Sequence, residues 1–203
     1  MELLAGPDLA ALASAWIAER ASRSDPFRIA LVGGSTPRRT YERLSDCPLR
    51  WSAWHVWWGD ERLVPADHPD SNERLAREVL LSRVPIPEEQ IHPLRSLDVE
   101  LPARFDLVLL GIGTDGHTAS LFPGDPALEE RERGIVRVAR PDHPRLTLTY
   151  PVLDAARAAA FLVAGAGKRE ILARVLAGDE SLPAARVRAE ETVVLADEAA
   201  AGS

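Results

Sequence analysis

Apolar runs and amphipathic stretches alternate along the whole chain. The apolar runs predict strands at residues 28–32, 54–58, 105–110, 135–139, 145–150, 159–164 and 192–195. Helices are predicted at residues 7–21, 37–44, 72–83 and 168–177, with a helical turn at 154–157. Strands that alternate with helices indicate a three-layer α/β fold around a mainly parallel sheet. No repeat or linker divides the sequence, so we expect one domain over residues 1–203.

The stretch from Phe105 to Gly124 contains the most informative residues. Its apolar run at 105–110 suits a strand that is buried on both faces, in the middle of the sheet. Three glycines follow, and they allow a tight turn in which Asp115 and His117 flank the last of them. Open α/β sheets bind ligands beyond the carboxyl ends of their strands, so this pair is a candidate catalytic site. From the local pattern alone, a structural loop with a hydrogen-bonded histidine is an equally good interpretation.

The same glycines have the GxGxxG spacing of dinucleotide-binding folds, but the sequence around them does not fit that motif. The motif needs a long helix directly after its last glycine. Proline and glycine at 123–126 leave room for only about two helical turns over 118–122. The acidic residues that follow lie in a polar run, not at the end of a second strand. We therefore predict no dinucleotide site.

Two further strand ends carry residues suited to binding an anion. After the strand at 28–32, the sequence GGSTP leads into a helix, with Thr36 as the expected N-cap and Pro37 as the first helical residue. Free N–H groups and the helix dipole would face a phosphate there, although an ordinary capped turn is the commoner use of such a sequence. Lys168 is expected in the first turn of the helix at 168–177, where it opposes the dipole unless an anion lies between them.

A charged triplet follows the tryptophan-rich strand at 54–58. Asp60, Glu61 and Arg62 come directly after Gly59, again at an expected carboxyl edge of the sheet. One interpretation is a solvated loop. The other is that Asp60 and Arg62 reach across to the turn that holds the Asp115 and His117 pair, and the local pattern favours neither.

The overall charge limits the classes of partner. The chain has 203 residues and a net charge of -7, which disfavours nucleic acid and anionic membranes, so positive charge for an anionic substrate must be supplied locally. The single cysteine, Cys47, excludes an internal disulfide and a cysteine-rich metal site. Without a signal peptide or a membrane span, we expect a cytoplasmic protein with no membrane partner. Both a monomer and a small homo-oligomer are compatible with the sequence.

Four sequence blocks together resemble the 6-phosphogluconolactonase family. They are GGSTP at Gly33–Pro37, WWGDERLVPADHPDSN at Trp57–Asn72, GIGTDGHTASLFP at Gly111–Pro123 and RLTLTYPVLDAARAAAFLVAGAGKREIL at Arg145–Leu172. The blocks occur in the family's order and span nearly the whole chain. The resemblance implies a Rossmann-like, doubly wound sheet. It also implies hydrolysis of 6-phospho-D-glucono-1,5-lactone to 6-phospho-D-gluconate, the second step of the oxidative pentose phosphate pathway.

The resemblance also implies roles for individual residues. His117 would remove a proton from the attacking water, and Asp115 would orient its ring. The remaining expected site residues are Asp60 in the catalytic set, Gly34, Ser35 and Thr36 at the phosphate, and Arg62, Asn72, Arg145 and Lys168 as further substrate contacts. The glycine-rich turn and Arg62 are candidates for stabilising the oxyanion. A lactone is already an activated acyl group, so no cofactor is expected. The five histidines show no ligand-like pairing, so we expect no metal site.

Two other functions remain as alternatives. Amino-sugar-phosphate deaminases and isomerases look similar around Asp115–His117, but they continue with an isoleucine and a catalytic acid, where this chain has Thr118 and Phe122. A non-catalytic sugar-phosphate sensor is the second alternative, although the sequence has no spare length or basic patch for a DNA-binding segment. Glu73 and Arg140 stand where the lactonase family often has tyrosine and lysine, and we expect them at the rim of the pocket.

Overall fold

The computed structural model describes residues 1–202, which form two β-sheets with helices packed around them. The strands are β1 (Glu2–Gly6), β2 (Phe27–Leu31), β3 (Trp54–Trp58), β4 (Asp60–Arg62), β5 (Leu107–Leu110), β6 (Ile135–Val138), β7 (Arg145–Leu148), β8 (Ala158–Val163) and β9 (Glu191–Asp197). The α-helices are α1 (Leu9–Ala21), α2 (Ser35–Ser45), α3 (Asn72–Ala76), α4 (Tyr150–Ala155), α5 (Arg169–Leu176) and α6 (Glu198–Ala201). A π-helical turn at Arg77–Leu81 extends α3, and short 3₁₀ turns lie at Trp51–Ala53, Glu88–Gln90, Pro126–Glu129, Ala166–Lys168 and Pro183–Arg186.

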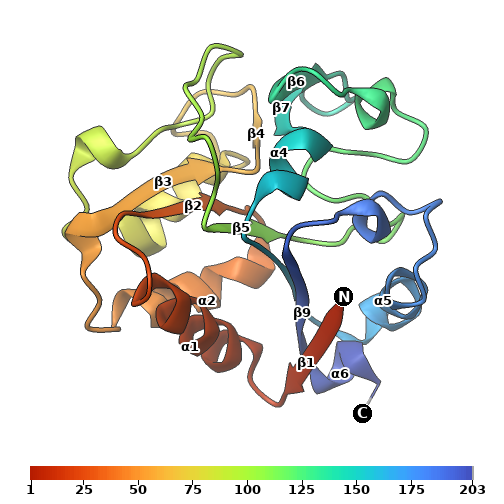
Figure 1. Cartoon of the computed structure of the whole chain (residues 1–203), viewed down its shortest axis with the longest axis horizontal. Helices are drawn as coiled ribbons and strands as arrows, with labels where there is room; N and C mark the ends of the chain where they lie inside the picture. The colour runs from red at the N-terminus through yellow and green to blue at the C-terminus, as the bar shows by residue number, and fades with distance from the viewer. Residues whose placement is uncertain (203) are drawn as a thin grey trace.

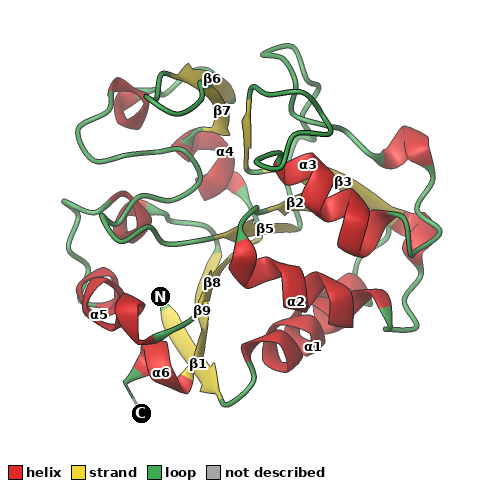
Figure 2. Cartoon of the chain, turned by 180° about the vertical axis from the view of Figure 1, so that it is seen from behind, coloured by secondary structure: helices red, strands yellow, loops and turns green. Residues whose placement is uncertain are grey.

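The larger sheet is parallel throughout and has the order β1-β9-β8-β5-β2-β3. Helices α1 and α2 cover one face, and α5 and α6 lie on the other (Figure 1, Figure 2). This arrangement confirms the predicted three-layer α/β fold with a Rossmann-like sheet. Strand β5 lies between β8 and β2 and is buried along its whole length, as its unbroken apolar sequence predicts.

The chain reverses its direction of travel across the sheet between β2 and β5. From β2 it moves outward to β3, then returns past β2 to β5 and continues the other way through β8 to β9. Loops that leave adjacent strands in opposite directions at such a point open a crevice at the carboxyl edge. The segments after β2, β5 and β8 therefore meet at one place, and all three contain residues that the sequence marks as candidates.

The smaller sheet is antiparallel, with the order β4-β7-β6. The charged triplet after β3 forms β4 and is not a solvated loop, because Asp60 and Glu61 are buried. Pairing of β4 with β7 places Arg62 directly opposite Arg145. The strands expected at 135–139 and 145–150 thus exist, but they belong to this second sheet, which the sequence pattern did not separate from the first.

The predicted start of one helix was wrong. Helix α2 begins at Ser35 with Gly34 as its N-cap, so Thr36 is already inside the helix. Gly34 has a φ of 103°, a conformation that favours glycine, and this lets the chain turn into the helix two residues earlier than predicted. The segment 118–122 forms no helix; Thr118 makes an isolated antiparallel bridge to Leu121 instead.

Four further elements differ from the prediction at their ends or were not predicted. Tyr150 begins α4 and does not continue β7, because Pro151 suits the first turn of a helix and cannot donate to a strand ladder. The strand β1 and the short helix α6 had no clear periodic pattern. The helix predicted at 168–177 begins with a 3₁₀ turn that ends at Lys168. Among residues 1–202, no helix is long and apolar enough to cross a lipid bilayer.

Tyr41 fixes the start of the loop that follows β2. Its ring is fully buried under the sheet, and its hydroxyl donates to the carbonyl of Val32 at 2.8 Å and accepts from the Val32 N–H at 3.0 Å. Burial raises the pKa of Tyr41, so the hydroxyl stays protonated and keeps both bonds. The last backbone groups before Gly33 are therefore satisfied by a side chain from α2.

We predict that Tyr41→Phe lowers the free energy of unfolding by about 1–3 kcal/mol, because both backbone groups of Val32 lose their buried partner. Urea unfolding followed by circular dichroism measures the change. Tyr150→Phe is the matched control, since the Tyr150 hydroxyl makes a single bond, to the Pro183 carbonyl at 2.9 Å. An equal or smaller loss for Tyr41→Phe than for the control would contradict the prediction.

Candidate active site

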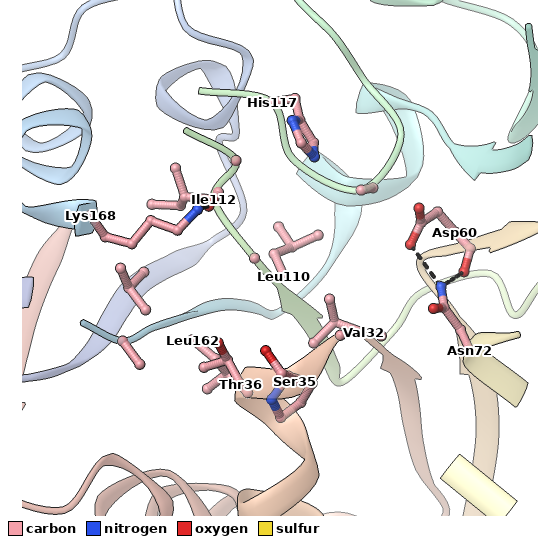
Figure 3. A pocket seen from close by; sticks show the side chains of 18 of the residues that line it. Val32, Ser35, Thr36, Asp60, Asn72, Leu110, Ile112, His117, Leu162 and Lys168 are labelled. Atoms are coloured by element: carbon pink, nitrogen blue, oxygen red, sulfur yellow. Dashed lines mark hydrogen bonds between the residues drawn. The ribbon is translucent and has the colours of Figure 1, made fainter. Parts of the chain in front are cut away.

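A pocket of about 310 Å³ opens at the carboxyl edge where the chain reverses direction. Figure 3 shows His117 on one side, Ser35 and Thr36 at the start of α2, Lys168 from the segment after β8, and Asp60 beside Asn72. The sequence-predicted residues that line it are Gly34, Ser35, Thr36, Asp60, Arg62, Asn72, His117, Arg145 and Lys168. The remaining predicted residue, Asp115, is not part of the pocket lining and contacts His117. The fold thus gathers residues from four separate blocks of the sequence around one cavity.

His117 is held by Asp115 through two hydrogen bonds. The ring Nδ1 lies 2.5 Å from Asp115 Oδ1, and the His117 backbone N–H donates to the same oxygen at 3.1 Å. Partial burial alone would raise the pKa of Asp115, but these hydrogen bonds outweigh it and leave the pKa below its ordinary value. The carboxylate therefore stays ionised and fixes the orientation of the imidazole.

Gly113 makes room for this pair. A Cβ at position 113 would lie 2.0 Å from His117 Nδ1 and 2.5 Å from Asp115 Oδ1, closer than any side chain permits. The turn is closed by its own backbone, because Gly113 N–H donates to the His117 carbonyl and Gly116 N–H donates to the Gly113 carbonyl. These two N–H groups are therefore engaged within the turn, which leaves Arg62 as the other expected oxyanion donor.

Phe122 packs against the His117 ring, with ring centroids 4.4 Å apart. The guanidinium of Arg140 lies 3.9 Å from the centre of the same phenyl ring, and that of Arg145 lies at 5.6 Å. Arg140 does not line the pocket, contrary to the expected place at its rim, and supports the aromatic ring behind His117. Sequence reasoning assigned Phe122 no role beyond replacing an acid; its contact with His117 depends on the bridged turn at 118–121, which the local pattern did not predict.

Asp60 is a buried carboxylate with partners on two other segments. Its Oδ2 accepts from the Ser120 hydroxyl at 2.6 Å, and its Oδ1 accepts from the Asn72 side-chain amide at 3.3 Å. The same amide nitrogen donates to the Asp60 backbone carbonyl at 2.8 Å. Asp60 thus reaches the segment that follows His117 through Ser120, and it makes no hydrogen bond to His117 or Asp115 within residues 1–202. Ser120 was missed, because only the fold brings it next to Asp60.

Glu61 holds the start of α3. Its carboxylate accepts from the backbone N–H groups of Arg62, Asn72 and Glu73 at 2.7 to 2.8 Å and from the Ser71 hydroxyl at 3.2 Å. Burial raises the pKa of Glu61, and the hydrogen bonds from the backbone offset part of that rise. This contact fixes Asn72 at the pocket. Sequence reasoning assigned no role to Glu61, because the local sequence does not show that a glutamate will be buried.

Glu73 is not at the rim of the pocket, contrary to expectation. It is buried and pairs with Arg77 at 2.8 Å and with Arg95 at 2.7 Å. Two guanidinium groups satisfy the charge of this carboxylate. Glu73 stands where tyrosine was expected from the resemblance. This difference therefore affects the packing of α3 and not the lining of the pocket.

The N-terminus of α2 is open to the pocket. No side chain caps the helix, so its first N–H groups remain available to a ligand. Gly33 brings the backbone close to the opposite wall, since a Cβ there would lie 1.8 Å from Asn72 Oδ1. Ser35 and Thr36 add hydroxyl groups at the same place. An anion fits these donors.

Three cationic side chains face the cavity. Lys168 Nζ donates to the Ile112 carbonyl at 2.7 Å and has no carboxylate partner among the described residues. Arg62 donates from Nη1 to the Asp70 carbonyl at 2.8 Å, and Arg145 pairs with Asp142 at 2.6 Å. The Nε atoms of both arginines are buried without a partner within residues 1–202. Positive charge is therefore concentrated at the pocket of an otherwise acidic chain.

The prediction that the histidines have no ligand-like pairing was wrong. His68, Asp70 and His143 each offer one ligand atom, and these atoms lie within 4.8 Å of one another. None of the three residues lines the pocket that contains His117. The cluster is formed by two loops that are 73 residues apart in sequence, and spacing along the chain could not reveal it.

Comparison with known proteins gives consistent results. The family model described as glucosamine-6-phosphate isomerases/6-phosphogluconolactonase matches residues 5–195. A 6-phosphogluconolactonase of Nostoc sp. is 43% identical over 202 residues, which cover 87% of this chain and 84% of that protein. The human 6-phosphogluconolactonase is 40% identical over 190 residues, covering 80% of this chain and 74% of that protein.

Solved structures agree with these relatives. The crystal structure of 6-phosphogluconolactonase from Thermotoga maritima has a TM-score of 0.85 at 31% identity, covering 97% of this chain and 99% of that chain. A monomeric glucosamine-6-phosphate deaminase has a TM-score of 0.84 at 20% identity, so it shares the fold. Because the family model covers most of the sequence and several relatives exceed 30% identity, the chain belongs to the family of glucosamine-6-phosphate isomerases and 6-phosphogluconolactonases.

Proposed function

We propose that the protein hydrolyses 6-phospho-D-glucono-1,5-lactone to 6-phospho-D-gluconate, the second step of the oxidative pentose phosphate pathway. The relatives that cover most of the chain are named for this activity. The observation that carries the proposal is the arrangement of the pocket. A histidine oriented by a carboxylate lies on one side of it, and an open helix N-terminus with a lysine lies on another.

His117 acts as the general base in this proposal. With Nδ1–H donating to Asp115, the ring nitrogen Nε2 carries a lone pair and can take a proton from a water molecule. The resulting hydroxide attacks the lactone carbonyl carbon and forms a tetrahedral oxyanion. When the oxyanion collapses, the ring C–O bond breaks, and the imidazolium returns its proton to the departing alkoxide. Asp115 stabilises the charged imidazolium between these two steps.

The phosphate of the substrate lies at the N-terminus of α2. There the free N–H groups after Gly34 and the hydroxyls of Ser35 and Thr36 donate to its oxygens. Lys168 adds a positive charge from the segment after β8, and the anion then relieves the unfavourable position of this lysine beside α5. Binding the phosphate at a fixed point places the lactone carbonyl near His117.

Arg62 and Arg145 contribute the remaining positive charge. They stand opposite each other on β4 and β7, which is an unfavourable arrangement for like charges unless an anionic group lies between them. Each has a buried Nε without a protein partner in the described chain, so a ligand oxygen can complete its hydrogen bonding. We assign stabilisation of the oxyanion to this pair, with Arg62 as the residue expected from sequence.

Asp60 has a positioning role in this proposal. Both of its carboxylate oxygens are engaged, one by Ser120 and the other by Asn72. A carboxylate held in this way supports the wall of the pocket. Asn72, whose side chain lines the cavity, is then free to offer its amide oxygen to a hydroxyl of the sugar.

Phe122 argues against the deaminase alternative. The acid that completes the catalytic set of the amino-sugar-phosphate deaminases is expected at this position, and the phenyl ring here packs on His117. An apolar ring cannot transfer protons during ring opening. The pocket therefore favours water activation by a single histidine.

We predict that His117→Ala lowers kcat for lactone hydrolysis by roughly 10²–10⁴-fold, the usual contribution of a general base. The lactone is generated in situ from glucose 6-phosphate, and proton release near neutral pH is measured above the spontaneous rate. His55→Ala is the matched control, because His55 lies on β3 outside the pocket. Acceleration retained by a folded His117→Ala variant would move the base to another residue. No acceleration by the unmodified protein would refute the lactonase proposal and make amino-sugar phosphates the next substrates to test.

The Asp115→Asn variant tests whether Asp115 orients the imidazole of His117 or binds the substrate. The asparagine amide can donate to Nδ1 and favour the tautomer with hydrogen on Nε2, which cannot accept a proton from water. We expect kcat to fall by about 10²-fold or more while KM changes little. Steady-state kinetics on the same lactone assay test this. A rise in KM with unchanged kcat would instead assign Asp115 to substrate binding.

Lys168→Met tests the phosphate site. Losing a charged hydrogen-bond donor should raise KM about tenfold to a hundredfold. It should weaken competitive inhibition by inorganic phosphate to a similar degree. Arg169→Met is the matched control, since it removes the same charge from the adjacent residue, which does not line the pocket. Equal effects of the two substitutions would indicate a general electrostatic contribution and would contradict direct contact.

A further inference from the structure

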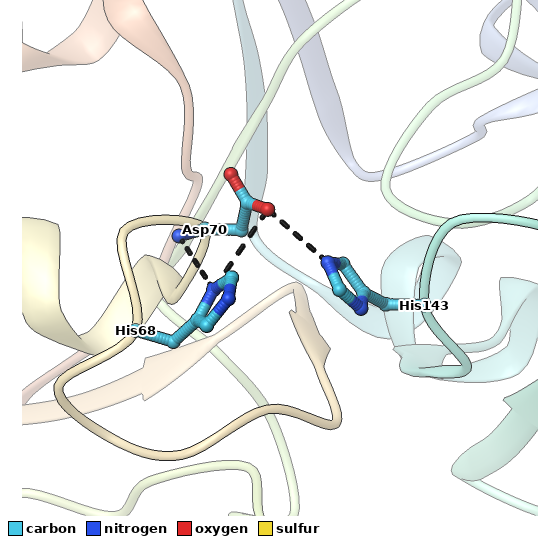
Figure 4. Close-up of side chains that lie close together, drawn as sticks. All are labelled: His68, Asp70 and His143. Atoms are coloured by element: carbon cyan, nitrogen blue, oxygen red, sulfur yellow. Dashed lines mark hydrogen bonds and ion pairs between the residues drawn. The ribbon is translucent and has the colours of Figure 1, made fainter.

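A second cluster of potential ligand residues lies on the loops beside the pocket. His68 and Asp70 belong to the loop between β4 and α3, and His143 belongs to the loop between β6 and β7. Figure 4 shows both imidazole rings turned toward the carboxylate of Asp70. Asp70 Oδ2 lies 3.1 Å from His143 Nε2 and 3.8 Å from His68 Nδ1.

We propose that His68, Asp70 and His143 form a binding site for Zn²⁺. Two imidazoles and a carboxylate are a ligand set that zinc accepts, and water would occupy the fourth position. Zinc lies about 2.1 Å from each ligand atom, which places tetrahedral ligands about 3.4 Å from one another. The two separations from Asp70 Oδ2 lie on either side of this value, and the three ligand atoms together span no more than 4.8 Å. Small side-chain rotations in these loops would complete the geometry.

His68 Nδ1 acts as an acceptor inside the cluster. The backbone N–H of Asp70 donates to it at 3.2 Å, so this nitrogen carries the lone pair that a metal ion would use. A metal ion would replace this long hydrogen bond with a coordinate bond. Neutral imidazole and ionised carboxylate are the protonation states that zinc requires.

The neighbouring cations do not compete for the Asp70 carboxylate. Arg62 donates to the backbone carbonyl of Asp70, and Arg145 is paired with Asp142. Both oxygens of the Asp70 side chain therefore remain available to the two histidines. Within residues 1–202, no other group of three histidine, cysteine or acidic side chains comes together in this way.

A metal ion here would connect the two loops that hold the arginines of the pocket. The loop with His68 and Asp70 provides the carbonyl that anchors Arg62, and the loop with His143 contains the partner of Arg145. Two hydrogen bonds join the loops in this structure. The Leu63 N–H donates to the Pro144 carbonyl at 2.8 Å, and His143 contacts Asp70. Zinc would act as a structural clamp at the rim. This inference does not depend on the proposed reaction.

Isothermal titration of the metal-free protein with ZnCl₂ tests the site. We expect one Zn²⁺ per chain, and at least about tenfold weaker binding for His143→Ala and for Asp70→Asn. His55→Ala is the matched control, because His55 and His92 form a histidine pair without a third ligand, 3.5 Å apart. His117→Asn tests whether the His117 and Asp115 pair takes the metal instead. Circular dichroism checks that each variant is folded.

Hydrogen exchange provides a second measurement. Zinc should slow amide exchange in residues 63–71 and 139–144 of the unmodified protein, and it should not do so in His143→Ala. Zinc binding that survives both His143→Ala and Asp70→Asn would overturn the proposal. So would the absence of binding, or binding lost only in His117→Asn.

Discussion

The buried carboxylate of Asp60 connects the parts of the molecule that form the pocket. It joins β4 to Asn72 at the start of α3 and to Ser120 in the segment after His117. A buried charge without partners costs several kcal/mol, so this position is tolerated only when both neighbouring segments are in place. Glu61, the next residue, applies the same constraint to the backbone of α3. These two acids fix the wall against which the turn that holds His117 packs.

The distribution of charge follows from this arrangement. The chain carries a net charge of -7, but the carboxylates of Asp60 and Glu61 in β4 are buried and accept hydrogen bonds from other parts of the fold. The cations Arg62, Arg145 and Lys168 face the cavity and use only part of their hydrogen-bonding capacity on protein carbonyls or exposed acids. A local excess of donors in an acidic protein attracts a small anion and does not favour a polyanion.

Sequence reasoning pointed to residues that line the pocket, because most of them follow a strand or open a helix, where local rules are strong. The apolar run at 105–110 predicted a central strand, and the adjacent glycines predicted a close backbone turn. The resemblance of four blocks to a known family supplied the roles. It could not show that Asp60 bonds to Ser120, or that Phe122 packs on His117, since these contacts depend on a turn at 118–121 that has no periodic pattern.

The sequence by itself determined the alternation of strands and helices, the burial of β5 and the residue types available at each strand end. These follow from local hydrophobic period and backbone preference. Only the tertiary structure decided that β4 pairs with β7 in a second sheet, that Glu73 turns away from the pocket, and that His68 and His143 meet at Asp70. Each of these contacts joins residues that are far apart in the chain or selects one orientation of a side chain. Their formation depends on packing of the whole domain, which spacing along a sequence does not encode.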